Sequence, residues 1–540
     1  MRSDDIVSCH VLVIGSGGAG VRAAIEADAY GNTVLISKTI VGKGGCTPMA
    51  EGGYNAVISV EDSCDIHFED TLRGGAYLND HELVRILVKE APQRMNDLIK
   101  WGAVFDVTSD SCVAQRPFGG QRFPRTCYAG DRTGHEMMVT LTEKLKDTSV
   151  AMYQEISVIA LLRDNGGISG AIGLDRKGEM ITFLADTTVL ATGGGTKVYD
   201  ISTNSSSGTG DGYAIGYNAG AELIDMEQVQ FHPTGAVYPY DARGRLVTEA
   251  VRGEGGVLKN RLGERFMERY DPARMELSTR DVVSRSIATE ILEGRGTDHQ
   301  AVYLDVTHLP ARQIEERLPI MLEQFLKFGV DIRKEPMEVA PTAHHIMGGF
   351  RIASDCSTTL ERLFACGEVA GGVHGANRLG GNALADTQVF GKRAGESAGK
   401  SKIREKRPDE VQVDTQSKRL DRFLQGNTNP ADVIRDLKMA MWEGAGIFRT
   451  REGLEKTLQI IQDLKKVPLR AQSMDNLADC CTAENMLTTA SLIVQSALLR
   501  PESRGAHVRK DIVQDWQPET SPFGHTYISL TCRGIEKVSP

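Results

Sequence analysis

The sequence lacks the cysteine spacing that a bound metal ion or cluster would need. Ten cysteines are spread over 540 residues, and no two of them form a CxxC pair. We therefore expect this chain to hold no zinc and no iron–sulfur cluster of its own. Most of the ten are expected to be reduced cytosolic thiols.

Long apolar runs are missing as well. No stretch approaches the roughly 18–20 apolar residues that span a bilayer. The first expected strand starts so close to the N-terminus that no room is left for a signal or transit peptide. We therefore expect a cytoplasmic protein without direct membrane insertion, whose contact with the inner face of a membrane would be peripheral and made through partner subunits.

Positive charge is in deficit, with 62 Lys and Arg against 72 Asp and Glu and a net charge of −10. This balance argues against nucleic acid as a partner. A site for an anionic ligand would have to be locally positive against the overall field. Proline is scarce at 18 residues against 57 glycines, which predicts many tight turns. The length exceeds a single core, so we expect about two to four domains.

A strand–turn–helix–strand unit occupies residues 11–38. Its turn reads Gly15-x-Gly17-x-x-Gly20. Gly15 allows the tight turn, Gly17 lets the backbone approach a pyrophosphate, and Gly20 lets the helix lie close to the strand. The N–H groups at the start of the helix favour bound phosphates. The pattern predicts a dinucleotide site.

The second strand of this unit does not say which dinucleotide is bound. An acidic residue usually ends that strand, but Ser37 and Lys38 stand there. The choice between FAD and NAD therefore stays open at this point. A small-residue segment at 42–54 suggests backbone that lies against a flat ring. A buried strand that runs into glycines at 192–195 indicates that the chain returns to the nucleotide there.

Five spaced blocks resemble the flavoprotein subunit of succinate dehydrogenase and fumarate reductase, including the soluble archaeal and bacterial forms. The blocks are 230–235 (QFHPTG), Thr248-Glu249 with 252–256, Arg280-Asp281 with Ser284, His344 with 347–349, and 374–378 (HGANR). The matches run in order over nearly the whole chain. This resemblance implies FAD as the cofactor.

The resemblance also implies an α/β fold. Residues 1–224 and 346–402 would form the two parts of an FAD-binding Rossmann-like domain. Residues 225–345 would be an inserted α+β capping domain that carries substrate residues. A helical domain would follow at 403–500, where apolar residues recur at helical spacing, and an extended C-terminal tail at 501–540.

The implied reaction is the interconversion of fumarate and succinate, by hydride transfer at the flavin N5 with arginine-mediated proton transfer. Hydride adds to fumarate only if the charge that builds on a carboxylate is neutralised. By resemblance, Arg378 and His344 hold one carboxylate, and His232 and Thr248 hold the other. Phe118 completes the expected substrate residues.

Arg280 is the implied proton donor. Glu249 and Arg252 would resupply its proton, and their spacing of three would place them on one face of a helix. Arginine is an unusual acid because its pKa lies above ~12, so the site would have to be dry. The expected cofactor-binding residues are Gly15, Gly17, Gly18, Ala19, Gly20, Ser37, Lys38, Cys46, Thr47, Gly52, Gly53, Thr192, Gly193, Asp211, Glu368, Asn382 and Leu384.

Three positions depart from the family pattern. Cys46 stands where most membrane-bound relatives attach FAD through a histidine, so we expect non-covalent FAD and a bias toward fumarate reduction. A thioether to Cys46 is the alternative. Ala383 replaces a serine near the flavin, and His345 replaces a tyrosine, which leaves the substrate preference slightly open.

Two other functions compete with this interpretation. L-aspartate oxidase is a relative that also holds FAD non-covalently, but residues 116–120 and 344–349 look more like the succinate/fumarate branch. A non-catalytic flavin protein that only relays electrons is the second, and the intact set of Arg280, Glu249 and Arg252 argues against it. Since this chain has no cluster motif, the resemblance implies an iron–sulfur partner subunit. A membrane anchor or a thiol-oxidising subunit could complete such a complex.

Overall fold

The computed structural model describes residues 5–514, 516–532 and 534–538. Its centre is a seven-stranded sheet in the order β6-β2-β1-β9-β8-β7, with β16 beside β9. The strands are β1 (Asp5–Ile14), β2 (Thr33–Ser37), β6 (Ala151–Gln154), β7 (Ser157–Asp164), β8 (Gly167–Leu174), β9 (Met180–Leu190) and β16 (Leu363–Ala365). Strands β6, β2, β1, β9 and β16 run parallel, whereas β8 and β7 complete an antiparallel edge.

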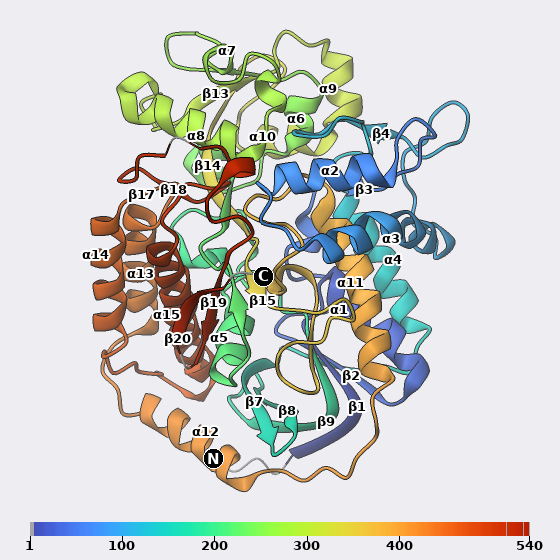
Figure 1. Cartoon of the computed structure of the whole chain (residues 1–540), viewed down its shortest axis with the longest axis vertical. Helices are drawn as coiled ribbons and strands as arrows, with labels where there is room; N and C mark the ends of the chain where they lie inside the picture. The colour runs from blue at the N-terminus through green and yellow to red at the C-terminus, as the bar shows by residue number, and fades with distance from the viewer. Residues whose placement is uncertain (1–4, 515, 533, 539–540) are drawn as a thin grey trace.

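Helices cover this sheet. α1 (Gly18–Ala27) and α11 (Asn382–Gly399) contact its strands and each other. α4 (Thr133–Lys146) packs on α1, α3 (His81–Lys100) packs on α11, and α2 (Cys64–Gly74) packs on α3. Asp80 caps α3 by accepting from the backbone N–H groups of Glu82 and Leu83, as acidic N-caps commonly do. The chain leaves the sheet after β9 and returns to it at β16, so the nucleotide fold is interrupted by the intervening residues (Figure 1).

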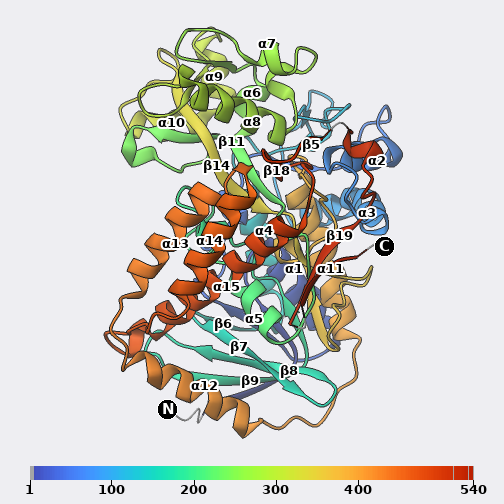
Figure 2. The ribbon, with the colours of Figure 1, turned by 60° about the vertical axis from the view of Figure 1, so that its left-hand side comes forward.

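The part of the intervening chain from β11 to β14 forms a cap above the sheet domain (Figure 2). Its sheet has the order β11-β14-β13-β12, and its own apolar core is separate from the main one. The strands are β11 (Val229–Tyr238), β12 (Val257–Lys259), β13 (Val302–Asp305) and β14 (Met337–Ile346). The helices are α6 (Glu249–Gly253), α7 (Met267–Tyr270), α8 (Arg280–Glu290), α9 (Ala311–Arg317) and α10 (Pro319–Lys327).

A helical region follows, as the apolar spacing predicts. It contains α12 (Glu410–Phe423), α13 (Pro430–Gly444), α14 (Arg451–Leu464) and α15 (Leu477–Leu499), and α15 packs against α5 (Asp211–Asn218). The last residues run back across the molecule and add strands β18 (Val508–Arg509), β19 (Tyr527–Thr531) and β20 (Gly534–Val538). β18 pairs with β17 (Phe448–Arg449), and β19 pairs with β10 (Leu223–Ile224), which also pairs with β15 (Gly349–Phe350).

A last, small sheet joins β3 (Tyr54–Asn55), β5 (Thr126–Cys127) and β4 (Gln115–Arg116). The predicted α/β class, with an inserted cap, a helical region and an extended tail, is confirmed. The predicted domain bounds stay a prediction. Among the described residues, no helix is long and apolar enough to cross a membrane.

Candidate active site

A cavity of about 990 Å³ lies between the glycine turn after β1 and the cap. Residues expected for the cofactor and residues expected for the substrate line the same cavity. Gly20, Arg252 and Asn382 are the expected site residues that are not part of its lining. One continuous space therefore connects the nucleotide turn with the charged residues of the cap.

The backbone of the β1–α1 turn explains its glycines. Gly15 has φ of +111°, and a Cβ there would lie 2.2 Å from the carbonyl oxygen of Ala191. A Cβ on Gly20 would lie 1.8 Å from the carbonyl oxygen of Gly15, so Gly20 serves the contact between helix and strand and not the cavity. Gly17 has room for a Cβ, which would meet its nearest atom, Thr47 Oγ1, at 3.5 Å, an ordinary van der Waals contact.

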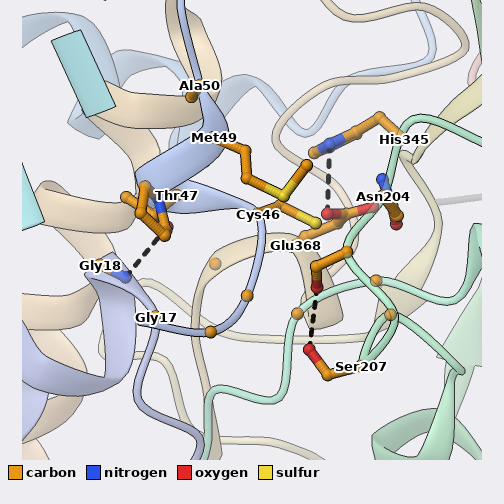
Figure 3. A pocket seen from close by; sticks show the side chains of 18 of the residues that line it. Gly17, Gly18, Cys46, Thr47, Met49, Ala50, Asn204, Ser207, His345 and Glu368 are labelled. Carbon is orange, nitrogen blue, oxygen red and sulfur yellow. Dashed lines mark hydrogen bonds and ion pairs between the residues drawn. The ribbon is translucent and has the colours of Figure 1, made fainter. Parts of the chain in front are cut away.

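The wall beside this turn is also open backbone. The N–H of Gly18 donates to Thr47 Oγ1 at 3.0 Å (Figure 3). A Cβ on Gly193 would meet no described atom within 4 Å. Thr192 Oγ1 is buried without a hydrogen-bond partner among the described residues. Open glycine backbone, a helix N-terminus without a side-chain cap from its N-cap residue and an unpaired hydroxyl fit a bound dinucleotide.

An acidic residue reaches the end of β2 from a distant part of the chain. Lys38 Nζ donates to Asp211 Oδ2 at 2.8 Å and to Thr482 Oγ1 at 3.1 Å. Asn485 Nδ2 donates to the other oxygen of Asp211 at 2.8 Å. Burial disfavours the charged carboxylate, but Lys38 and these hydrogen bonds outweigh it and lower the pKa of Asp211.

Cys46 lies in the pocket beside Met49, on the side where Glu368 and His345 also project (Figure 3). Burial, and the nearby Glu368 carboxyl, raise the pKa of the Cys46 thiol to about 11. The thiol is therefore protonated at neutral pH. Because the thiolate is the reactive form of cysteine, this environment disfavours attack on a cofactor.

The carboxyl group of Glu368 has surroundings that change its pKa. Its Oε1 accepts from the N–H of Ile346 at 3.0 Å, and its Oε2 lies 3.5 Å from His345 Nδ1 (Figure 3). Burial raises the pKa of Glu368 to about 7, despite Ile346 and Arg378. Burial also lowers the pKa of His345 well below its usual value, so His345 is neutral at pH 7.

Asn382 begins α11 but points away from the cavity. Its Oδ1 accepts from Asn55 Nδ2 at 2.7 Å and lies 3.0 Å from His67 Nε2. Its Nδ2 donates to Thr71 Oγ1 at 3.1 Å. The side chain of Asn382 is thus part of a buried polar cluster that joins α2, β3 and α11.

Three charged residues of the cap meet at the other end of the cavity. Arg280, the first residue of α8, donates to Glu249 Oε2 from Nε at 2.8 Å and lies 2.7 Å from it through Nη2. Glu249 Oε1 accepts from the N–H of Gly119 at 2.8 Å. These contacts, together with Arg252, lower the pKa of Glu249 although its burial raises it.

Arg252 stands one turn further along α6. Its Nη2 is 3.9 Å from Glu249 Oε2, and its Nη1 donates to the carbonyl of Glu276 at 2.6 Å. Arg252 Nε and Nη2 are buried without hydrogen-bond partners among the described residues. Burial lowers the pKa of this guanidinium, which makes it a more ready proton source than an exposed arginine.

Two histidines face each other across the cavity. The ring centroids of His232 and His344 are 5.0 Å apart. The N–H of Thr234 donates to His232 Nδ1 at 3.2 Å, so the ring proton of neutral His232 is assigned to Nε2. His344 Nδ1 lies 2.8 Å from Thr203 Oγ1. Burial, and then Arg280, lower the pKa of both rings well below the usual value.

The remaining expected substrate residues line the same end. Phe118 is buried and its ring lies under the guanidinium of Arg116 at 5.7 Å. Thr248 caps α6 by accepting from the N–H of Ala250 at 3.3 Å. Burial and the charge of Arg280 lower the pKa of Arg378 to about 9. Arg378 Nε has no hydrogen-bond partner among the described residues.

Several polar residues of this site were not predicted from the sequence. Gln230 contacts Arg280 and Arg378, and Asn377 contacts Gln230. Thr203 orients His344 from outside the cap. Gln230 and Asn377 stand inside the motif blocks, which was the available signal, but their contacts run between segments that are far apart in the sequence.

Comparisons with known proteins agree with this geometry. Residues 10–384 match the FAD binding domain family, and residues 434–528 match the family of the fumarate reductase flavoprotein C-terminal region. The chain is 53% identical to one of the subunits of the fumarate reductase (CoM/CoB) of Methanothermobacter marburgensis, over 96% of each chain. It is 36% identical to the fumarate reductase flavoprotein subunit of Escherichia coli K12, over 93% of this chain and 88% of the relative.

Solved structures of similar fold include one of a fumarate reductase subunit. An E. coli quinol fumarate reductase FrdA variant matches with a TM-score of 0.92 and 33% identity, over 99% of this chain and 97% of that one. Adenylylsulfate reductase of Archaeoglobus fulgidus shares the fold, with a TM-score of 0.80 at 18% identity.

Proposed function

Because the chain belongs to the flavoprotein subunit family of fumarate reductase and succinate dehydrogenase, whose members are FAD-dependent oxidoreductases, we propose that it is a catalytic subunit that interconverts fumarate and succinate. The physiological direction we propose is fumarate reduction. The observation that carries the proposal is the Arg280–Glu249 ion pair at 2.7 Å, which lies in the same cavity as the nucleotide turn.

The substrate would lie between two sets of donors. Arg378 and His344 would bind one carboxylate, and His232 and Thr248 would bind the other. A guanidinium can pair with a carboxylate through two hydrogen bonds, and hydrogen bonds to charged groups contribute about 1.5–3 kcal/mol each. The neutral histidines donate without adding charge, so the site is positive chiefly through its arginines.

FAD, when bound, supplies the acceptor or donor of the hydride. The residues proposed to hold it are those of the 15–20 turn, Lys38, Asp211, Thr192 and Glu368, all but Gly20 in the cavity lining. The chain's own part in the chemistry is to neutralise carboxylate charge and to move one proton.

The proton would travel along three side chains. Arg280 would give it to the substrate carbon, and Glu249 and Arg252 would restore it. The distances support this order, because Glu249 touches Arg280 directly and lies 3.9 Å from Arg252. All three side chains are buried, which provides the dry environment that an arginine acid requires.

The full chain, loaded with FAD, tests the proposal. We expect fast fumarate-dependent oxidation of reduced viologen and weaker succinate-driven dye reduction. No fumarate turnover from a folded, yellow protein would overturn the assignment. Oxygen-dependent oxidation of L-aspartate under those conditions would move the protein to the aspartate oxidase class.

We also propose that the FAD is bound non-covalently. The support is Cys46, which replaces the usual histidine and whose raised thiol pKa keeps it protonated. Acid precipitation of the holoprotein should release all flavin into the supernatant, and Cys46→Ser should bind FAD as the wild type does. Flavin that stays with the wild-type precipitate but not with the Cys46→Ser precipitate would establish a thioether instead.

For the electron partner we propose an iron–sulfur subunit. Among the described residues no group of three or more potential ligands could hold a metal ion, so a cluster would belong to another chain. The relative at 53% identity carries CoM/CoB in its name, which favours a thiol-oxidising subunit over a membrane anchor. Peripheral attachment to a membrane would depend on such partners. Copurification of the native complex, followed by iron and labile-sulfide analysis of each chain, tests this proposal.

A further inference from the structure

Gln230 lies between the two arginines that face the cavity. Its Oε1 accepts from Arg280 Nη1 at 3.2 Å and from Arg378 Nη2 at 3.2 Å. Its Nε2 donates to the carbonyl of Arg378 and to Asn377 Oδ1, both at 2.8 Å. Every polar atom of this fully buried amide is therefore used.

Asn377 fixes which way the Gln230 amide points. Asn377 Nδ2 donates to Asp281 Oδ1 at 3.0 Å and to the carbonyl of Gly74 at 3.2 Å. A carboxylate and a carbonyl only accept hydrogen bonds, so the amino group of Asn377 must face them. Its Oδ1 must then face Gln230, which in turn directs Gln230 Oε1 toward the two arginines.

Asp281 is held in turn by Arg285, one turn further along α8, which also contacts the C-terminal segment. Its Oδ2 is 3.0 Å from Arg285 Nη1, and the same nitrogen donates to the carbonyl of Gly505 at 2.9 Å. Gly505 belongs to the C-terminal segment that passes under the cap (Figures 1 and 2). The next residue of that segment, Ala506, donates its N–H to the carbonyl of Ala376 at 2.9 Å.

We propose that Gln230 is a positioning residue that holds the guanidinium groups of Arg280 and Arg378 side by side for one dicarboxylate, and that the Asn377–Asp281 pair sets its orientation. This inference rests on the proposed function. The physical reason is the repulsion between two buried cations. Glu249 pairs with Arg280 at 2.7 Å, whereas the Gln230 oxygen accepts from both arginines.

A neutral amide suits this role better than a carboxylate would. Its oxygen attracts both guanidinium groups, which reduces their repulsion. It adds no negative charge that would compete with the carboxylates of the substrate for the same donors. Burial and Arg280 already depress the pKa of Arg378, so the position of this acceptor affects the charge that the substrate meets.

Asn377→Asp is the test variant. The new carboxylate would face Asp281 across the 3.0 Å contact, and the repulsion would displace the Asn377–Gln230 link. We expect the Kd of malonate, a dicarboxylate with no CH–CH bond to oxidise, to rise at least about tenfold. The measurement is flavin absorbance during titration of the FAD-loaded chain. The KM for fumarate should rise with it.

The double variant Asp281→Asn with Asn377→Asp supplies the rescue. The amide at 281 would donate to the carboxylate at 377, whose other oxygen still accepts from Gln230. We expect malonate affinity to return to within about threefold of the wild type. Such a recovery would trace the loss of affinity in the single variant to the repulsion between positions 281 and 377, and a control variant separates it from a general loss of stability.

Asn260→Asp is the matched control. Asn260 is also buried in the cap, and its Nδ2 donates to Glu264 Oε2 at 2.8 Å and to Glu290 Oε2 at 2.9 Å. This variant places a carboxylate against two others, away from the cavity, and is at least as unfavourable electrostatically as Asn377→Asp. It should lower the melting temperature, while the malonate Kd of the folded protein stays at the wild-type value.

Four outcomes decide the matter. A folded, FAD-loaded Asn377→Asp variant with wild-type malonate affinity overturns the positioning role, and so does a double variant that binds no better than the single one. Wild-type protein that neither binds malonate nor reduces fumarate overturns the proposed function itself. The inference is supported if malonate affinity falls in Asn377→Asp, recovers in the double variant and stays at the wild-type value in Asn260→Asp.

Discussion

At the scale of single residues, Arg280 and Arg378 have different proposed roles, the first in proton transfer and the second in substrate binding. Arg280 carries the short ion pair to Glu249, whereas Arg378 has the free Nε and is proposed to bind a carboxylate. Arg280→Gln should therefore lower kcat for fumarate reduction by about 10²–10⁴-fold, the usual contribution of a general acid, and change the malonate Kd much less. Single-turnover kinetics and a malonate titration measure the two effects. Equal losses in both would assign Arg280 to binding.

The raised pKa of Glu368 predicts how the stability of the chain depends on pH. Its carboxyl has a pKa of about 7 in the folded chain against 4.5 for the ordinary group, so between these values the folded state binds a proton that the unfolded state does not. The stability of the FAD-free chain should then fall as the pH rises through this window and level off above it. Glu368→Gln cannot lose a proton and should avoid this fall.

The difference in the free energy of unfolding between Glu368→Gln and the wild type should shift in favour of the variant by about 3 kcal/mol between pH 4.5 and 7. Urea unfolding at a series of pH values measures it. Glu61→Gln, at an exposed position, is the control and should show no such trend. A stability difference for Glu368→Gln that does not change with pH would contradict the prediction.

At the scale of elements, the β1–α1 junction distinguishes glycines that serve packing from those that serve binding. A methyl group on Gly20 would clash with the carbonyl of Gly15, whereas one on Gly17 would meet its nearest atom at 3.5 Å. Gly20→Ala should therefore lower the stability by about 2 kcal/mol or more, because the well-packed helix and strand must move apart. Gly17→Ala should melt like the wild type without FAD.

The Gly17→Ala variant should also bind FAD more weakly than the wild type. Gly17 lines the cavity, and its substitution should weaken FAD binding in a titration followed by flavin fluorescence. Thermal melts of both FAD-free variants provide the comparison. If Gly20→Ala melted at the wild-type temperature, the close approach of α1 to β1 would not require glycine.

At the scale of the whole molecule, Arg500 connects three regions. It follows α15 and pairs with Asp225 at 2.8 Å, next to the start of the cap, and with Glu502 at 3.2 Å in the C-terminal segment. A third buried partner, Glu227, contacts its Nε. Arg500→Met should cost about 3–5 kcal/mol, because it leaves buried carboxylates without a cation.

Denaturant unfolding measures this loss. Arg312→Met is the control, since Arg312 pairs with Glu316 in an exposed i,i+4 contact that should contribute only about 0.3–0.5 kcal/mol. Similar losses in the two variants would mean that the buried cluster does not hold the regions together.

The sequence by itself determined the local elements and the family. The glycine turn, the apolar helices and the motif blocks depend on residues close together in the chain, so their backbone requirements are visible in the sequence. All but three of the site residues expected from the sequence line the cavity, because they stand in segments that can be recognised without knowing the fold.

Only the tertiary structure decided which distant residues meet. Asp211 ends up beside Lys38, Asn382 points away from the cavity, and Gln230 lies between Arg280 and Arg378. Each of these contacts joins segments that are separated by 50 or more residues. Their geometry follows from how the sheet, the cap and the C-terminal segment pack together, and no local pattern of residues encodes that packing.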